Sequence, residues 1–366
     1  MSKIVIITPQ DLDCVSGNNT SRRRLASGLR KSGHEVEEIP VAEARGRRDS
    51  LRGFNLIHAL HAFKSGVEAR QLALELKVPY VVSITGSDVN GDLQQSSRRA
   101  QILAVLADAA LILCTAKETA RRLNSELRIK TPCIHIPKGV EIPAEAPPEP
   151  SGDEPGRFLL VAGWRAIKNP LFSLEPLERL QREQPGIRLR FVGPALEPAY
   201  LDQWRQRRDR FPFAENAGVI APEAMPDEYA RASIALNTSH AEGGANALLE
   251  AMAHARAVLA SDIEGNRELV RFAPDHWESS TGILYRTKPP LTSGEILRRH
   301  DPEDFLAKAR RLILDRELRR RIGANAREHV RREHSVDREI AAVMQAYARA
   351  QASPANAPAR LEAPRW

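Results

Sequence analysis

The sequence predicts an α/β protein built from two doubly wound, Rossmann-like domains. The chain has 366 residues, enough for about two domains at roughly 150 residues each. Short apolar runs alternate with longer helical patterns from one end to the other, and a Pro-rich segment interrupts the alternation near the middle. Such alternation, with apolar strands, is typical of parallel sheets that are covered by helices on both faces.

The first part of the chain contains five candidate strands. They are short, largely β-branched runs at residues 4–7, 55–58, 80–84, 111–114 and 133–136. Between them, the patterns indicate helices near residues 21–31, 66–76, 97–108 and 117–126. We therefore expect an N-terminal Rossmann-like domain over residues 1–142.

A linker and a second series of strands follow. Residues 143–156 are rich in proline, glycine and acidic residues, a composition that holds neither a helix nor a central strand. Strand candidates then recur at residues 158–162, 188–192, 233–237, 258–260 and 283–285. These patterns predict a C-terminal Rossmann-like domain at 157–335, a helix at 336–350 that crosses back to the first domain, and a flexible tail at 351–366. Two such domains would face each other across a cleft between the carboxyl ends of their sheets.

Composition excludes several classes of protein. Apolar residues make up 42% and charged residues 28% of the chain, and no apolar run approaches the roughly 20 residues of a membrane-spanning helix. The cysteines Cys14, Cys114 and Cys133 lie far apart, so neither a disulfide framework nor a thiolate metal site is expected. Met1 leads almost directly into the first strand candidate, which leaves no room for a signal peptide and predicts a cytoplasmic protein.

The net charge of +7 raises the question of a polyanionic partner. The arginines are scattered, and most of their clusters also contain acidic residues, so solvated helix faces explain them more simply. Aromatic residues, at 5%, are too few for base-stacking platforms, and no nucleic-acid partner is expected. Basic helices such as residues 204–210 would permit peripheral contact with the inner membrane surface. The oligomeric state is left open.

Residues 237–254 contain the most informative pattern. A strand ends, a glycine pair turns the chain, and an apolar helix begins. The backbone N–H groups of Gly244, Ala245 and Asn246 at the start of this helix would form a site for phosphate.

Two carboxylates accompany this helix. Glu250 is surrounded by apolar residues, so it needs a partner or a wet cavity, which a pair of ligand hydroxyls or an arginine would supply. Glu242 lies at the carboxyl end of the strand, where it would face the cleft or, alternatively, complement the helix dipole. The specific signal is the spacing of seven residues between the two.

These motifs resemble those of a known family. Residues 239–253 (Ser-His-Ala-Glu-Gly-Gly-Ala-Asn-Ala-Leu-Leu-Glu-Ala-Met-Ala) and 257–266 (Ala-Val-Leu-Ala-Ser-Asp-Ile-Glu-Gly-Asn) are similar to the signature of retaining family 4 glycosyltransferases with the GT-B fold. Further similar segments follow the family's order at 163–170, 191–194, 237–239 and 281–285. The segments 17–18, 60–66, 85–88 and 192–198 resemble two subgroups, the glycosyltransferase 1 domain-containing proteins and the bacterial selenosugar synthases.

The resemblance implies roles for residues of the second domain. Glu250 would accept the ribose hydroxyls of a nucleotide, and the amides of Gly243, Gly244, Ala245 and Asn246 would hold its diphosphate.

Arg165 and Lys168 would neutralise the leaving diphosphate, and Glu242 is counted with them among the catalytic residues. In most of the family the arginine directly follows the glycine, with the lysine further along. Here Arg165 and Lys168 lie three residues apart, a compact spacing that the two subgroups share.

The resemblance also implies roles in the first domain. Gly17 and Asn18, expected in the loop after the first strand, would approach the phosphates or the donor sugar. His61 resembles the family's cleft histidine, which reaches the donor sugar.

Lys64 and Asp88 are candidates on the acceptor side: Lys64 would steer an anionic acceptor, and Asp88 would orient the acceptor or His61. Asp11 and Asp13 form a DxD pattern that we interpret as coincidental, so no metal ligands are assigned.

These residues and the resemblance predict a metal-independent transferase that moves a sugar from a nucleotide sugar, expected to be a UDP-sugar, to an undetermined acceptor. Retention of configuration is what the resemblance implies. No cofactor beyond the nucleotide-sugar co-substrate is required. One alternative is a selenosugar synthase, which joins selenophosphate to a UDP-N-acetylhexosamine. Others are a nucleotide-sugar epimerase, which would react without an acceptor, and a non-catalytic binder of nucleotide sugars or polyanions.

Overall fold

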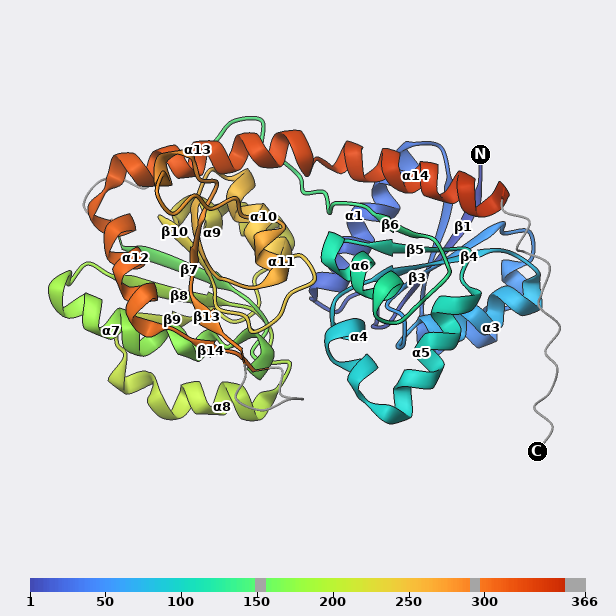
Figure 1. Cartoon of the computed structure of the whole chain (residues 1–366), viewed down its shortest axis with the longest axis horizontal. Coiled ribbons are helices and arrows are strands. Elements are labelled where there is room, and N and C mark those ends of the chain that lie inside the picture. Colours follow the sequence, from blue (N-terminus) through green and yellow to red (C-terminus); the bar gives the residue numbers. More distant parts are fainter. Residues whose placement is uncertain (149–155, 290–296, 353–366) are drawn as a thin grey trace. The chain divides into compact units, whose positions relative to one another are not determined.

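The computed structural model describes residues 1–148, 156–289 and 297–352. They form two compact units (Figure 1). The first unit contains Met1–Cys14, Asn18–Pro137 and the described residues from Asp337 to Ala352, and the second contains Val15–Gly17 and the described residues of Lys138–Val336.

The first unit is built on a parallel sheet with the strand order β2-β1-β3-β4-β5-β6. Its strands are β1 (Lys3–Thr8), β2 (Glu35–Pro40), β3 (Leu56–Leu60), β4 (Tyr80–Ile84), β5 (Leu111–Cys114) and β6 (Cys133–His135). Its helices are α1 (Gly17–Lys31), α2 (Val41–Ala44), α3 (Gly66–Leu76), α4 (Ser87–Asn90), α5 (Ser96–Asp108), α6 (Lys117–Ser125) and α14 (Val336–Ala352). The sheet order reverses between β1 and β3, which makes this edge the topological switch point of the unit.

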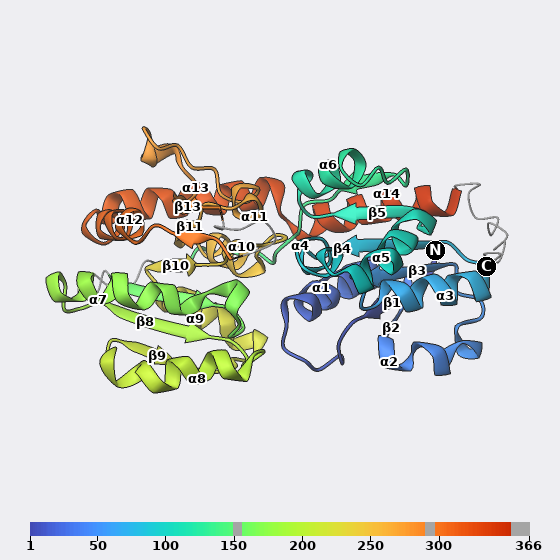
Figure 2. The same ribbon diagram turned by 60° about the horizontal axis from the view of Figure 1, so that its bottom comes forward.

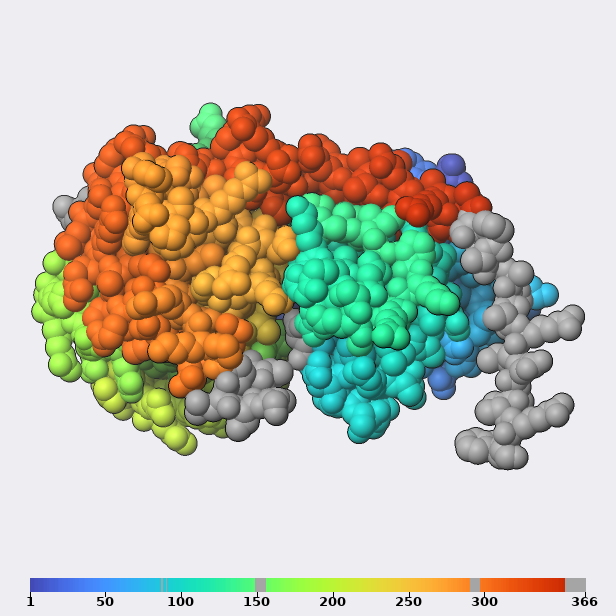
Figure 3. All heavy atoms as spheres, viewed as in Figure 1, coloured from blue at the N-terminus to red at the C-terminus, as the bar shows by residue number. Residues whose placement is uncertain are grey.

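Helices cover both faces of the first sheet. Apolar side chains of α3 and α5 pack with Val82 and Ile112 in one core, and the segment around α5 and α6 covers the face seen in Figure 3. On the other side, α14 is attached to the sheet through a 2.7 Å hydrogen bond between His58 Nδ1 and the Tyr347 hydroxyl. A 2.6 Å ion pair between Arg24 and Glu339 joins α14 to α1.

The second unit has a parallel six-stranded sheet with the order β12-β11-β10-β7-β8-β9. Its strands are β7 (Arg157–Val161), β8 (Arg188–Val192), β9 (Ala214–Asn216), β10 (Ile234–Asn237), β11 (Ala257–Ser261) and β12 (Ile283–Tyr285). A separate antiparallel pair consists of β13 (Thr287–Lys288) and β14 (Arg299–His300). In Figure 2 the labelled strands of the second sheet follow one another from top to bottom in the stated order, and those of the first sheet follow their stated order from bottom to top.

Alternate residues of the strands in the second sheet pack into two separate hydrophobic cores. Leu259 packs in one core with α7 and α12, whereas Val258 packs in the other with α9 and α10. The helices of this unit are α7 (Leu174–Glu183), α8 (Pro198–Arg207), α9 (Met225–Arg231), α10 (Asn246–Ala253), α11 (Glu264–Arg267), α12 (Pro302–Leu314) and α13 (Arg316–Glu333). The prediction of two doubly wound, Rossmann-like sheets is confirmed.

Two local expectations need correction. The sequence analysis did not identify β2, because only some of its residues are buried and three of its six residues are glutamates. It placed Gly17 and Asn18 in a loop, but helix α1 already begins at Gly17. The buried Asn19 side chain accounts for this early start, since its Nδ2 donates to the carbonyls of Asp11 and Cys14, both at 2.7 Å, and holds the preceding loop against the helix.

Candidate functional site

The candidate site lies at the switch point of the second sheet, where β7 and β10 are adjacent. The loop after β7 carries Arg165 and Lys168, and the loop after β10 runs through Glu242 to helix α10. The two loops are joined by hydrogen bonds, because the His240 N–H donates to the Ile167 carbonyl at 2.9 Å and Thr238 Oγ1 donates to the Lys168 carbonyl at 3.1 Å. Loops beyond the carboxyl ends of strands at a switch point are the usual ligand site of doubly wound sheets.

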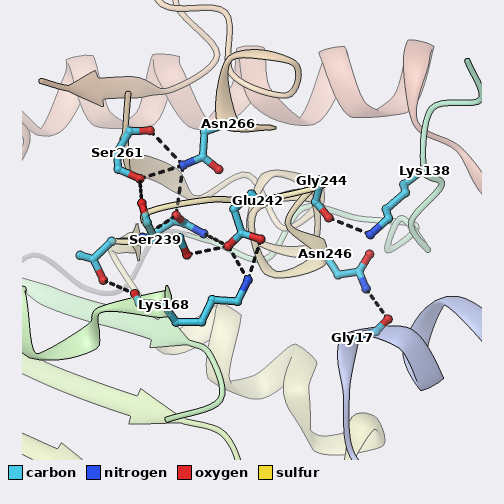
Figure 4. A network of polar contacts seen from close by, with 11 residues as sticks. Gly17, Lys138, Lys168, Ser239, Glu242, Gly244, Asn246, Ser261 and Asn266 are labelled. Carbon is cyan, nitrogen blue, oxygen red and sulfur yellow. Dashed lines mark hydrogen bonds and ion pairs between the residues drawn. The ribbon is translucent and has the colours of Figure 1, made fainter. Parts of the chain in front are cut away.

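Lys168 and Glu242 form a close ion pair at this point. Lys168 Nζ lies 2.6 Å from each carboxylate oxygen, and the exposed fractions of the two side chains are 18% and 6% (Figure 4). Glu242 Oε1 also accepts hydrogen bonds from Ser239 Oγ at 2.6 Å and Asn237 Nδ2 at 3.0 Å. Burial by itself raises the pKa of Glu242, but the Lys168 ammonium and these hydrogen bonds outweigh it and leave the pKa below its usual value. Glu242 is therefore an ionised anchor that fixes the lysine.

A second layer of polar groups supports this pair. Asn266 is fully buried, and its Nδ2 lies 3.1 Å from Asn237 Oδ1 and 2.9 Å from the Ser261 carbonyl. Ser261 Oγ donates to the Ser239 carbonyl at 2.7 Å. Two of the residues that hold Glu242, Asn237 and Ser239, are thus held in turn by residues of α11 and β11, as Figure 4 shows.

The start of helix α10 lies beside the ion pair. Gly244 has a φ of 103°, a conformation that glycine adopts readily, and Ala245 is the residue that precedes the first helical position. Asn246 Nδ2 donates to the Gly17 carbonyl at 3.0 Å, and Lys138 Nζ donates to the Gly244 carbonyl at 2.8 Å. Gly243 is half-buried in the same turn.

Arg165 and Glu250 have different environments. Arg165 has an extended backbone and is half-buried, and its Nε is a buried donor that has no acceptor in the described part of the chain. Glu250 on α10 accepts a 2.6 Å hydrogen bond from the Tyr229 hydroxyl of α9. Burial and the Glu250 charge raise the pKa of Tyr229 well above its usual value, so the hydroxyl stays protonated as the donor.

In the first unit, His61 follows β3 and has no exposed surface. Its φ of 126° is rare for a residue with a side chain, a form of strain that often marks functional sites. Its Nδ1 accepts hydrogen bonds from the amides of Phe63 and Lys64, both at 3.1 Å, and its Nε2 lies 3.3 Å from Asp92 Oδ2. Burial lowers the pKa of His61, so the ring is neutral and its proton is on Nε2.

Asp88 is a buried organiser of the same region. Its carboxylate accepts hydrogen bonds at 2.9 to 3.1 Å from four backbone amides, those of Ala62, Thr85, Gly86 and Val89. This arrangement holds the loop that carries His61.

The remaining candidates of the first domain lie near the surface. Lys64, Asp11 and Asp13 are exposed, and Asn18 is half-buried in the first turn of α1.

Within the described ranges 1–148, 156–289 and 297–352, no group of three His, Cys, Asp or Glu side chains is placed to hold a metal ion. None of the described helices is both long and apolar enough to cross a membrane.

Sequence reasoning missed several residues that shape the site. Three of them lie inside the quoted motifs but received no role: Asn237, Ser239 and Asn266. The signal that could have identified them is an amide or hydroxyl side chain near a carboxylate in an apolar segment. Tyr229 and Lys138 lie outside those motifs, and their local sequence carries no indication of their contacts.

Comparisons with known proteins agree with this architecture. Residues 156–315 match the family of glycosyl transferases group 1. Glycosyltransferase 1 domain-containing protein 1 of Xenopus tropicalis is 24% identical over 345 residues, which cover 88% of this chain and 92% of the relative.

Solved structures share the fold across both units. HepE of Anabaena, solved in complex with UDP and glucose, has a TM-score of 0.75 at 15% identity and covers 95% of this chain and 100% of its own. Sucrose-phosphate synthase of Thermosynechococcus elongatus has a TM-score of 0.76 at 18% identity and covers 95% of this chain and 98% of its own. The chain thus has the GT-B fold, and its residues 156–315 match the glycosyl transferases group 1 family.

Proposed function

We propose that the protein transfers a sugar from a UDP-sugar to a nucleophilic acceptor, with retention of configuration and without a metal ion or cofactor. The observation that carries this proposal is the arrangement around the start of α10. There the Lys168 ammonium, the buried Nε of Arg165 and the first amides of the helix lie at one switch point. Cations and helix N-termini together stabilise a diphosphate dianion.

UDP is the favoured nucleotide for two reasons. HepE, which shares the fold, is described in complexes with UDP and with UDP-glucose. In addition, Glu250 lies on α10, four residues after its first residue, and its carboxylate is an acceptor of the kind that a pair of hydroxyls requires. We assign this carboxylate to the ribose hydroxyls.

The reaction follows as a front-face displacement. The acceptor oxygen forms a bond to the anomeric carbon while the bond from that carbon to the diphosphate oxygen breaks. The departing diphosphate receives the electron pair and takes up the acceptor's proton. Lys168 and Arg165 stabilise the growing negative charge, and losing one of these cations is expected to lower kcat on the order of 10²-fold.

Acceptor recognition is assigned to the first unit. Lys64 is exposed there and would attract an anionic acceptor, whereas the strained, neutral His61 and the buried Asp88 keep their loop in place. The identity of the acceptor is to be determined by experiment, and both saccharides and selenophosphate are tested as acceptors.

The first experiment is a calorimetric titration of UDP in the presence of EDTA. Wild-type protein is expected to bind UDP at micromolar concentration, and Glu250→Ala is expected to weaken binding at least about tenfold, because two hydrogen bonds to a charged group are lost. Glu223→Ala is the matched control, since Glu223 is an exposed glutamate of the same unit. Equal affinities of the wild type and Glu250→Ala would overturn the assignment of Glu250, and the absence of UDP binding would overturn the donor.

A second experiment tests the transfer itself. The protein is incubated with UDP-glucose and UDP-N-acetylglucosamine in turn, with and without acceptors, and free UDP and the anomeric configuration of the product are measured. Retention with UDP release only when an acceptor is present supports the proposal. Conversion of the sugar without any acceptor would instead indicate an epimerase.

A further inference from the structure

Lys138 makes an unexpected contact with the turn that precedes helix α10. It follows β6 by three residues and is the first residue of the long segment of the second unit. Its Nζ donates a 2.8 Å hydrogen bond to the Gly244 carbonyl. In Figure 4, Lys138 reaches Gly244 from the side opposite to Glu242, so it is separate from the Lys168 ion pair.

This contact determines the orientation of one peptide group. The Gly244 carbonyl and the Ala245 N–H belong to the same planar trans peptide, so they point in opposite directions. A lysine that holds the carbonyl therefore turns the Ala245 N–H away from itself. In the part of the chain that the structure describes, this N–H has no acceptor.

Gly244 makes such control necessary. Its φ of 103° lies in a region that glycine enters easily, and a glycine on one side of a peptide allows that peptide to rotate at little cost. The buried Ala245 has an extended backbone and its carbonyl accepts hydrogen bonds from Leu248 and Leu249, so the first turn of α10 is fixed on its other side. The Gly244–Ala245 peptide is thus the adjustable part of the turn.

Lys138 is itself held firmly. Its carbonyl accepts a 2.9 Å hydrogen bond from His334 Nδ1, and the Val140 N–H donates to the His334 carbonyl at 2.8 Å. Val140 also forms a parallel bridge with Ser335, at the end of the second unit. The first and the last residues of the long segment Lys138–Val336 therefore lie close to each other, and Lys138 connects them to the turn before α10.

We propose that Lys138 is a positioning residue that aims the Ala245 amide at the diphosphate of the donor, by holding the Gly244 carbonyl from the opposite side. The proposal rests on the proposed function, because the diphosphate is the group that this amide would bind. It predicts that Lys138 affects the binding of the phosphates and not the binding of the nucleoside.

The test compares calorimetric affinities for UDP and uridine. Lys138→Met is expected to raise the Kd of UDP about tenfold, since a charge-assisted hydrogen bond that orders a ligand-binding amide is lost, and to leave the Kd of uridine within about twofold. Lys138→Arg keeps a donor and is expected to recover part of the loss. Lys288→Met is the control, because Lys288 is an exposed lysine of the same unit and its loss changes the charge equally.

Two outcomes would overturn the proposal. One is an unchanged UDP affinity in Lys138→Met, and the other is an equal loss for UDP and uridine, which a general disturbance of the unit would produce. A wild-type protein that binds neither ligand would instead refute the proposed function.

In that case, hydrogen exchange without ligand decides the structural part in Lys138→Met. If Lys138→Met folds poorly, the same measurement is made in Lys138→Arg, where a smaller rise is expected. Exchange in the peptide over residues 243–249 is expected to rise at least about threefold in Lys138→Met and not in Lys288→Met. Unchanged exchange would show that Lys138 does not hold the turn.

Discussion

At the scale of single residues, the Lys168–Glu242 ion pair combines a stabilising role in the fold with a proposed role in ligand binding. In the proposed function the Lys168 ammonium stabilises a diphosphate, whereas in this structure it is paired with Glu242. Because both side chains are largely buried, removing one partner leaves the other charge uncompensated. We expect Glu242→Gln to lower the free energy of unfolding by about 3 kcal/mol, measured by urea denaturation.

A double-mutant cycle checks that this loss comes from the pair. Glu242→Gln combined with Lys168→Met should cost less than the sum of the two single changes, by at least about 1 kcal/mol. The matched control is Glu317→Gln, which breaks an exposed pair with Arg320 and should leave the urea midpoint unchanged. If the two single substitutions lower the free energy of unfolding additively, the loss does not come from the ion pair.

The sequence indicates which residues carry charge at the site but not how they pair. Glu242 and Lys168 were each identified as catalytic candidates, but they are 74 positions apart and meet only because β7 and β10 are neighbours in the sheet. Glu250 was expected to need a partner, and one of its partners is Tyr229, a residue of another helix. Lys138 could not be identified, because a lysine in a loop has the same local pattern whether it is solvated or bonded to a distant carbonyl.

At the scale of elements, the short helix α11 positions the loop that carries Glu242. A Cβ atom at Gly265 would lie 2.3 Å from the Glu242 carbonyl oxygen and 2.7 Å from its carbonyl carbon, so this helix packs directly on the loop backbone. Gly265→Ala is expected to lower the free energy of unfolding by about 1 to 3 kcal/mol, because neither backbone can move without disturbing the ion pair. Thermal denaturation measures the effect.

Gly46→Ala is the control for this substitution, since a Cβ at Gly46 meets no atom within 4 Å. It should leave stability unchanged or slightly higher, because alanine reduces the freedom of the unfolded chain. Equal melting temperatures of Gly265→Ala and the wild type would show that α11 and the loop tolerate separation.

Prediction of elements from the sequence succeeded where strands are buried on both faces. The runs at 4–7 and 80–84 correspond to β1 and β4, whose residues are almost entirely buried. It failed for β2 and β9, which lie at sheet edges and expose alternate or successive residues, so that no continuous apolar run marks them. Edge position alone does not hide a strand, because the edge strands β6 and β12 coincide with the predicted runs 133–136 and 283–285. A strand is predictable where its residues form an apolar run, and β2 and β9 lack one.

At the scale of the whole molecule, both units contain imidazoles that are buried in the neutral form. His58 in the first unit is hydrogen-bonded to Tyr347 and Ser83, and burial lowers its pKa to about 3. In the second unit, burial lowers the pKa of His300 to about 3, and the pKa values of His240 and His329 to about 4. His300 Nδ1 accepts a hydrogen bond from the Tyr285 hydroxyl, and His300 Nε2 lies 3.1 Å from His240 Nδ1. An additional proton on either imidazole would break one of these hydrogen bonds.

These groups predict a loss of stability in mild acid. Histidines of the unfolded chain have a pKa of about 6.5, so below this pH they bind protons that the buried histidines of the folded units do not bind. The free energy of unfolding therefore decreases as the pH is lowered, until the pH reaches the pKa of the folded state. Each buried imidazole then lowers the free energy of unfolding by about 2 kcal/mol between pH 7 and pH 5. Urea denaturation at pH 7, 6 and 5 measures this slope, in a range where most carboxylates remain ionised. His58→Gln removes one titrating group and is expected to make the slope of the first unit shallower by about one proton. Identical free energies at pH 7 and pH 5 would mean that the imidazoles are protonated within the fold.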